Sequence, residues 1–324
     1  MPDSGIRITF YRRSVRTSFF LVLLLVFVGG VVRSTGAGLG CPDWPKCFGL
    51  WIPPTSISQI PVEFWNHPLS SSEGKIIFNP VKTWIEYLNR LLGVIIGFAI
   101  LVQAVLSLFC RPGGRSRFWS LFSLLLVLFQ GWLGSRVVSS DLRPVVITLH
   151  LLVALFIALS LLTALFFASG FESRPSYPNR PAWFKPVVLA TGFILLIQFY
   201  LGTEVRSQVD ALFREFNYEA RNQYSGRLDF RFLIHRSFSL LALGLLFIQY
   251  RKGTRWFSVE NNWILQLPAV LAMVLIISGI VLVNFDFPAF AQPFHLLLGL
   301  SIICAECWLV LHLFFVQKTM NSSP

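Results

Sequence analysis

The sequence predicts an all-α polytopic membrane protein whose eight transmembrane helices form two pseudo-symmetric four-helix bundles. Composition is the first reason, because 55% of the 324 residues are hydrophobic and 13% are charged, whereas a soluble domain has roughly 25% charged residues. Apolar runs long enough to cross a bilayer are the second reason, and an internal repeat is the third. Together they exclude a soluble globular domain, a disordered chain, a collagen-like chain and a secreted disulfide scaffold.

Eight apolar segments are near the roughly 20 residues that a helix needs to span a bilayer. We expect spans at about residues 18–36, 84–109, 118–138, 145–168, 186–203, 232–250, 264–284 and 293–316. The fifth is the least distinct, because it runs into the polar stretch from Gly202 to Arg206. Arginines precede the first run as in an export signal, but the run reaches Val32 without an A-x-A cleavage motif, so we interpret it as a retained helix.

The net charge of +12 is concentrated in alternate loops. With a cytoplasmic N-terminus, the cytoplasmic segments hold 14 basic and 3 acidic residues, which accounts for 11 of the 12 net positive charges. The positive-inside rule then places both termini in the cytoplasm and two large loops, at about 37–83 and 204–231, outside. The charge therefore indicates topology rather than a nucleic-acid partner.

The first four spans recur as the last four. At an offset of 145, the third and fourth spans match the seventh and eighth, superposing Gly134, Val138, Asp141 and His150 on Gly279, Val283, Asp286 and His295. At an offset of 146, Asn89-Arg90 falls on His235-Arg236, and Gly29-x-x-Val32-Arg33 matches Gly202-x-x-Val205-Arg206 more weakly. Parallel repeats of this kind are related by an axis along the membrane normal, and we assign the two halves to residues 1–170 and 171–324.

Three histidines occupy similar depths near the outer starts of the fourth, sixth and eighth spans: His150, His235 and His295. A histidine inside a span either marks a functional site or bonds a neighbouring helix, and three at repeat positions favour a site. His235 and His295 come from two helices of one bundle, so they could supply two axial imidazoles to a haem. Such a pair could also hold copper or zinc, but no third or fourth ligand is evident at that level.

Motifs along essentially the whole chain resemble those of the haem A synthases, the membrane enzymes of cytochrome oxidase assembly. They are the segment 30–49 with Cys41-Pro-Asp-Trp-Pro-Lys-Cys47, Glu86-x-x-Asn89-Arg90, Thr148-Leu-His-Leu-Leu152, His235-Arg236 and Gln292-Pro-Phe-His295. The resemblance implies haem b in the C-terminal half and a site for the substrate haem O in the N-terminal half. It also implies oxidation of a haem O methyl to a formyl group through an alcohol, with water as the oxygen source.

The resemblance assigns His235 and His295 as ligands of the haem b iron, and His150 as one of two histidines at the substrate haem. Asn89 stands where both the family pattern and the internal repeat have the other histidine. An amide is neither a strong iron ligand nor a near-neutral proton carrier. Either His150 suffices, another residue substitutes, or the N-terminal half is inactive; we favour the first, because the rest of the motif is intact.

Glu86 lies one helical turn before Arg90, beside the substrate-haem position. Its carboxylate could accept a proton or stabilise a cationic carbon during methyl oxidation, and the family's matching glutamate is essential, so Glu86 and His150 are the candidate catalytic residues. Alternatively, Glu86 is a helix-start acid paired with Lys82 or Arg90. Arg90 and Arg236 are candidates to contact haem propionates, or else to pair with nearby acids.

Cys41 and Cys47 lie in an outer loop with a proline-stiffened spacer, and a disulfide is the leading interpretation in an oxidising compartment. Whether it is a structural staple or redox-active stays open. Glu306 follows His295 by about three helical turns, so both face the bundle interior. A proton path and a hydrogen bond to a serine or threonine would each explain Glu306.

These features predict a haem A synthase in the bacterial cytoplasmic membrane, with haem sites near the outer face. The partners we expect are a haem O synthase upstream and an unidentified electron acceptor, with self-association as an open alternative and no nucleic acid. The alternative is a non-catalytic, haem b-binding electron-transfer or oxidase-assembly protein whose N-terminal site has decayed at Asn89. A small-solute transporter is disfavoured, because it would need broken helices and polar residues near the midplane.

Overall fold

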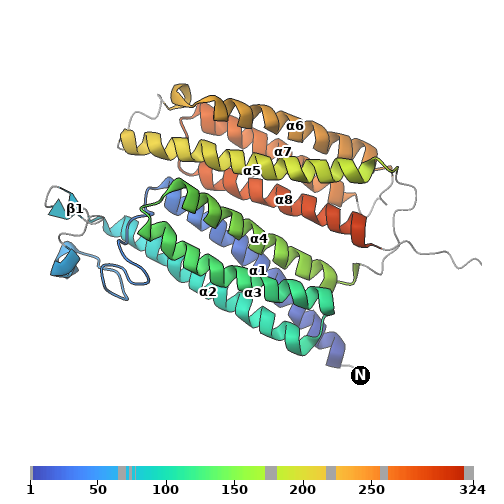
Figure 1. The fold of residues 1–324 in the computed structure, drawn as a ribbon, viewed down its shortest axis with the longest axis horizontal. Helices are drawn as coiled ribbons and strands as arrows, with labels where there is room; N and C mark the ends of the chain where they lie inside the picture. The colour runs from blue at the N-terminus through green and yellow to red at the C-terminus, as the bar shows by residue number, and fades with distance from the viewer. Residues whose placement is uncertain are drawn as a thin grey trace, which may run out of the picture. The chain divides into compact units, whose positions relative to one another are not determined.

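The computed structural model describes residues 3–64, 71–72, 75–76, 78–171, 181–216, 224–255 and 262–316. Eight long helices lie within these ranges (Figure 1): α1 (Asp3–Ser34), α2 (Pro80–Cys110), α3 (Gly114–Ser139), α4 (Pro144–Ala168), α5 (Phe184–Glu215), α6 (Phe230–Gly253), α7 (Trp263–Asn284) and α8 (Ala291–Phe315). The other elements are short: 3-10 turns at Ile57–Gln59, Val62–Phe64 and Ser225–Arg227, and the antiparallel strands β1 (Ser71–Ser72) and β2 (Lys75–Ile76).

All eight helices are long and apolar enough to cross a membrane, which confirms the predicted all-helical, eight-span fold for the described residues. Helix starts follow local chemistry. Asn79 caps α2 by accepting a hydrogen bond from the Lys82 N–H at 3.1 Å, with Pro80 in the first turn. Asp229 caps α6, and hydrogen bonds from Arg231 hold the pKa of this carboxyl below its usual range.

The prediction for the end of α5 was wrong, because the helix continues through the polar stretch to Glu215. Residues 204–215 therefore extend α5, and the outer loop expected from residue 204 begins only after them. Their polarity is one-sided: Arg206 pairs with Asp210 at 2.8 Å, while Val209 and Phe213 are buried against residues of α7 and its following turn. An amphipathic helix of this kind needs no continuous apolar run.

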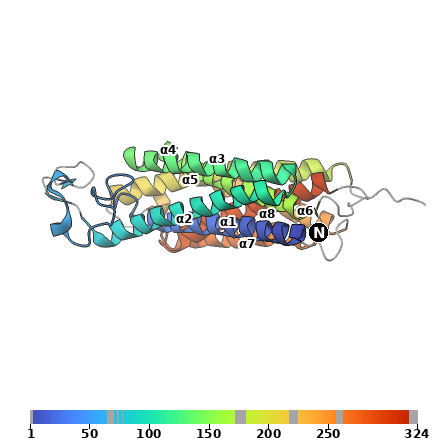
Figure 2. The same cartoon turned by 90° about the horizontal axis from the view of Figure 1, so that it is seen from below.

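The chain divides into two compact units, each described by itself: residues 1–111 and 117–161 form unit 1, and residues 112–116 and 162–324 form unit 2. In unit 1, α1 and α2 pack along each other, side by side in both views (Figures 1 and 2). Buried polar contacts tie both to α3, because Tyr11 bonds Ser120 at 2.5 Å and Gln103 bonds Ser123 at 3.0 Å. The N-terminus and the β1–β2 hairpin lie at opposite ends of this unit.

In unit 2, α5 packs on α6, α6 on α7, α7 on α8, and α8 back on α5, which closes a four-helix ring. One end is filled by an apolar cluster that includes Phe184, Leu265 and Leu309. Gly253 is closely packed there, because a Cβ atom at this position would lie 2.7 Å from a methyl carbon of Leu265 and would force that side chain to shift. The fold thus holds the first turns of α6 and α8, with their histidines, within one bundle.

Candidate functional site

Four positions in the first three turns of α2, α4, α6 and α8 share one arrangement. At each, a histidine or asparagine faces a glycine of the preceding helix. A Cβ atom added to the glycine would lie 3.3 to 3.9 Å from the facing side chain. The pairs are Asn89 with Gly29, His150 with Gly134, His235 with Gly202, and His295 with Gly279.

Glycine inside a helix costs up to about 1 kcal/mol relative to alanine. Its use at all four facing positions therefore indicates that space beside these side chains matters. Gly202 is the tightest case, since its added Cβ would lie 3.3 Å from the Cε1 atom of the His235 ring. The internal repeat therefore repeats a packing arrangement, in which a glycine on each odd-numbered helix leaves room for a polar side chain on the next helix.

In unit 2, His235 and His295 are close enough to interact electrostatically. Ser278 Oγ lies 2.7 Å from His295 Nδ1 and orients that ring, while Gln198 donates to the His235 backbone carbonyl at 2.8 Å. His235 Nδ1 is buried without a hydrogen-bond partner. A buried imidazole nitrogen without a partner is costly in a purely structural role, and two neighbouring imidazoles are a donor set that fits a haem iron.

In unit 1, His150 has a similar setting. Its Nδ1 atom is buried without a partner, and Gln130 donates to its backbone carbonyl at 3.0 Å, as Gln198 does for His235. Asn89 Oδ1 is likewise buried without a hydrogen-bond partner. Unit 1 therefore presents one imidazole and one amide at the positions where unit 2 presents two imidazoles.

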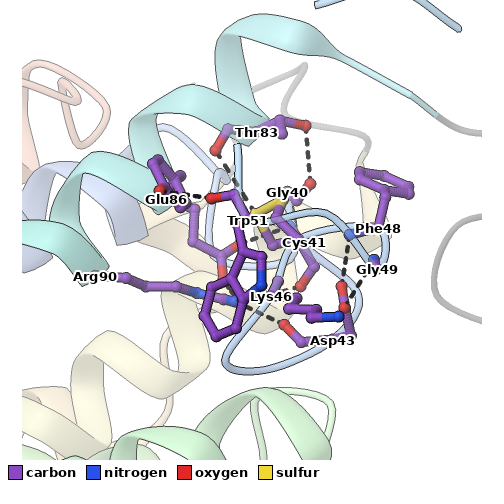
Figure 3. Close-up of a disulfide and its surroundings, with 12 residues drawn as sticks. Gly40, Cys41, Asp43, Lys46, Phe48, Gly49, Trp51, Thr83, Glu86 and Arg90 are labelled. Atoms are coloured by element: carbon purple, nitrogen blue, oxygen red, sulfur yellow. Dashed lines mark hydrogen bonds and ion pairs between the residues drawn. A yellow bond between two sulfur atoms is a disulfide. The ribbon is translucent and has the colours of Figure 1, made fainter. Parts of the chain in front are cut away.

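The predicted disulfide is present between Cys41 and Cys47 (Figure 3). Asp43 closes the loop around it, accepting hydrogen bonds from the backbone N–H groups of Phe48 at 2.6 Å and Gly49 at 2.9 Å. Both cysteines are fully buried, and Ile60 packs with them in one apolar cluster. The loop is a packed structural element rather than a loose connection.

The N-terminal turns of α2 hold this loop through its backbone (Figure 3). Thr83 Oγ1 donates to the Gly40 carbonyl at 2.8 Å, and the Cys41 N–H donates to Glu86 Oε2 at 2.9 Å. The approach is so close that a Cβ atom at Gly40 would lie 2.6 Å from the Lys82 carbonyl oxygen. Only glycine fits there, and its missing side chain lets the loop backbone contact the backbone of α2 directly.

Arg90 completes this clamp. Its Nη1 donates to the carbonyls of Asp43 at 2.6 Å and Lys46 at 3.0 Å, and its Nη2 donates to the Cys41 carbonyl at 3.2 Å and to Glu86. These four bonds use every N–H of the two terminal nitrogens. Of the two roles expected for Arg90, the structure contains the pairing with Glu86, and it leaves only the Nε–H for any propionate.

Glu86 is 4% exposed, and both of its oxygens accept hydrogen bonds, one from Arg90 and one from the Cys41 backbone. The carboxylate is therefore balanced by a guanidinium and fixed in position. The loop also lies against the end of α3, where Pro42, Asp43 and Trp44 line an open cavity of about 220 Å3 with Ser135, Arg136, Val138 and Ser139. This cavity begins one residue beyond Gly134, the glycine that faces His150.

The remaining candidates lie elsewhere. Arg236 stands over the ring of Phe232 at 5.9 Å. Glu306 is 1% exposed in unit 2, where its Oε1 accepts from Gln249 at 3.0 Å, and Gln249 also donates to Thr191 at 2.6 Å. Of the two alternatives left open for Glu306, a proton path and a hydrogen bond to a serine or threonine, the second is modified, because the donor to Glu306 is a glutamine.

Sequence reasoning missed Gln130, Gln198 and Ser278, which hold the histidine backbones or rings, and Thr83 in the clamp. The two glutamines stand in the sequence as isolated polar residues within apolar runs, and such residues mark buried polar contacts in membrane helices. Ser278 and Thr83 carry no such signal, because both residue types are common in membrane helices.

Fold and site together define an all-helical polytopic membrane protein with polar sites at equivalent ends of its helices. Residues 12–307 match the model of the cytochrome oxidase assembly protein family (COX15-CtaA), and the chain belongs to that family.

Similar proteins include the heme A synthase of Shewanella oneidensis, 31% identical over 61% of this chain and 57% of that protein. The heme A synthase of Shouchella clausii is 26% identical over 90% of this chain and 92% of its own length. That of Orientia tsutsugamushi strain Boryong is 34% identical over 39% of this chain and 37% of that protein. The match therefore spans little more than half of the Shewanella protein and nearly all of the Shouchella protein.

Proposed function

We propose that this protein is a haem A synthase, which oxidises a methyl group of haem O to a formyl group with water as the oxygen source. Family membership and the heme A synthases among its relatives support this activity. The observation that carries it is the set of four glycine-backed positions, two of them imidazoles in unit 2 and an imidazole with an amide in unit 1.

The substrate haem O binds in unit 1, where His150 approaches its iron. Conversion of a methyl group and one water to a formyl group releases four electrons and four protons, so a base and an electron exit are both needed. Glu86 is the proposed base, because it is a buried carboxylate fixed by Arg90 and the Cys41 N–H on the helix that carries Asn89. The clamp keeps this carboxylate in place during the reaction.

The cofactor is haem b in unit 2, held by His235 and His295, and when bound it supplies one-electron transfer. Ser278 orients the His295 ring through its 2.7 Å hydrogen bond, and Gln198 fixes the His235 backbone. Arg236 follows His235 directly and is the proposed propionate contact. The role of the Cys41–Cys47 bond is that of a staple, since the Arg90 and Glu86 contacts depend on the folded loop.

The proposed location is the bacterial cytoplasmic membrane, with both termini in the cytoplasm and the haem sites near the outer face. The basic loops support this orientation. Within unit 1, the hairpin lies at the end opposite the N-terminus, as this topology requires. A haem O synthase would deliver the substrate, and the final electron acceptor and any self-association are further parts of this proposal.

The test is co-expression with a haem O synthase in a host that makes no haem A, followed by mass spectrometry of extracted haems. We expect haem A or its hydroxymethyl precursor from the wild type. Glu86→Gln should abolish both products while haem b stays bound. Bound haem b with only unmodified haem O in the wild type would support the alternative, a non-catalytic haem protein with a decayed N-terminal site.

A further inference from the structure

The amide at Asn89 occupies a position that the fold otherwise gives to imidazole. The counterpart of Asn89 in the repeat is His235, and both face a glycine on the preceding helix. At Asn89 the contact is looser, since a Cβ atom on Gly29 would lie 3.9 Å from Oδ1, compared with 3.3 Å between Gly202 and His235. The amide therefore lies farther from its facing glycine than the His235 ring lies from Gly202.

Neighbouring groups on α2 and its loop are committed elsewhere. Glu86 uses both oxygens in the clamp, Arg90 carries no acceptor atom, and the sulfurs of Cys41 and Cys47 are bonded to each other. Among the described residues of unit 1, His150 is the only histidine. An amide oxygen is a poor ligand for haem iron, which takes imidazole, thiolate, thioether or phenolate.

We propose that a haem bound in unit 1 is held by His150 alone, and that its second axial position lies open beside Asn89 and accepts a small neutral ligand such as carbon monoxide. The proposal rests on the function proposed above, and it names the coordination state of the substrate at that site. The buried, unpartnered Oδ1 of Asn89 is then available to accept a hydrogen bond from water at the open face.

This arrangement separates the two haems by their chemistry. In unit 2, His235 and His295 would hold a haem with two imidazoles, and an iron ligated in this way would be low-spin and closed to carbon monoxide. In unit 1, a single imidazole leaves the ferric iron high-spin and the ferrous iron open. The difference comes from one residue of the repeat, Asn89 against His235, and it can be measured without turnover.

The experiment uses the full chain, co-expressed with a haem O synthase, purified in detergent and topped up with added haem O. Carbon monoxide is titrated into the dithionite-reduced protein, and the spin state of the ferric protein is read by electron paramagnetic resonance. We expect carbon monoxide to bind in proportion to the haem O content. Asn89→His should weaken this binding by about tenfold or more, because the new imidazole competes for the iron, and should convert the high-spin signal to low-spin.

Two variants serve as controls. Leu88→His puts an imidazole on the neighbouring position, whose side chain is 53% exposed, and should leave the carbon monoxide titration unchanged. His67→Ala tests the one other histidine of this half of the sequence, which lies outside the described residues, and should also change nothing.

A wild-type haem O that is low-spin and does not bind carbon monoxide would overturn the proposal, as would a gain of binding in His67→Ala. The outcome is separable from the proposed function. Haem A production by a protein whose haem O does not bind carbon monoxide would contradict only the proposal that His150 alone holds the haem O iron. Carbon monoxide binding without haem A production would contradict only the activity.

Discussion

Glu86 and Arg90 form an ion pair that the disulfide loop surrounds with three carbonyls and a backbone N–H. A buried charge pair is stable only when its remaining hydrogen-bonding atoms are also satisfied, and the loop satisfies them. The sequence could predict the pairing, because the two residues are one turn apart, and it could predict the disulfide. It could not predict the clamp, since carbonyl contacts leave no trace in residue types.

Arg90→Lys should loosen the loop while keeping the charge. An ammonium group is a point charge and cannot reach three carbonyls and a carboxylate in the fixed fork geometry of guanidinium. We expect Cys41 and Cys47 to be alkylated roughly tenfold faster under mild reduction, the effect of losing about one charge-assisted hydrogen bond. Mass spectrometry measures the rate, Arg143→Lys at an exposed position of unit 1 is the control, and equal rates in both variants would contradict the clamp.

Gly202→Val should abolish binding of the haem b that we propose for unit 2. Even a Cβ atom at Gly202 would lie 3.3 Å from the His235 ring, so a branched side chain must displace the imidazole. Gly244→Val on α6 is the matched control, because nothing lies within 4 Å of its added Cβ atom. The haem b content of the purified proteins, taken from their absorbance spectra, should fall severalfold in the first variant only; equal haem content would show that Gly202 does not serve to make room for His235.

At the level of the helices, the apolar runs predicted all eight spans, because a helix that crosses a bilayer needs a long run of apolar residues. The end of α5 was missed, because residues 204–215 bury one face through Val209, Leu212 and Phe213 and keep polar residues on the other. The buried hydrogen bond between Gln249 of α6 and Glu306 of α8 was predicted only on the Glu306 side. The position of Glu306 on the interior face was visible from its spacing to His295, but its partner Gln249 was not, since pairing across helices depends on their rotation.

The Glu306–Gln249 bond gives a stability prediction for unit 2. Gln249→Leu removes the donor and leaves Glu306 buried without it, which should cost about 1–3 kcal/mol in the free energy of unfolding. Adding Glu306→Leu removes the stranded acceptor and should restore most of the loss. Thermal unfolding of the single and double variants measures the coupling, and strictly additive losses would contradict the idea that the two groups serve each other.

For the whole molecule, the charge distribution determines a topology that can be tested without haem. A phosphatase that folds only outside the cytoplasm should be active when inserted after Ser58, in the loop between α1 and α2. It should be inactive after Gly113, between α2 and α3, because the positive-inside rule keeps that arginine-containing connection in the cytoplasm. The opposite activities would invert the orientation and place the candidate sites at the cytoplasmic face.

The proposed activity is the conversion of haem O to haem A by this chain itself, with water as the oxygen source. The most direct measurement is anaerobic incubation of the purified protein with haem O and a chemical one-electron acceptor, followed by mass spectrometry of the extracted haems. We expect the formyl product to accumulate without dioxygen in the wild type and to be absent in Glu86→Gln. Unmodified haem O under these conditions, or product that appears only when dioxygen is admitted, would contradict it.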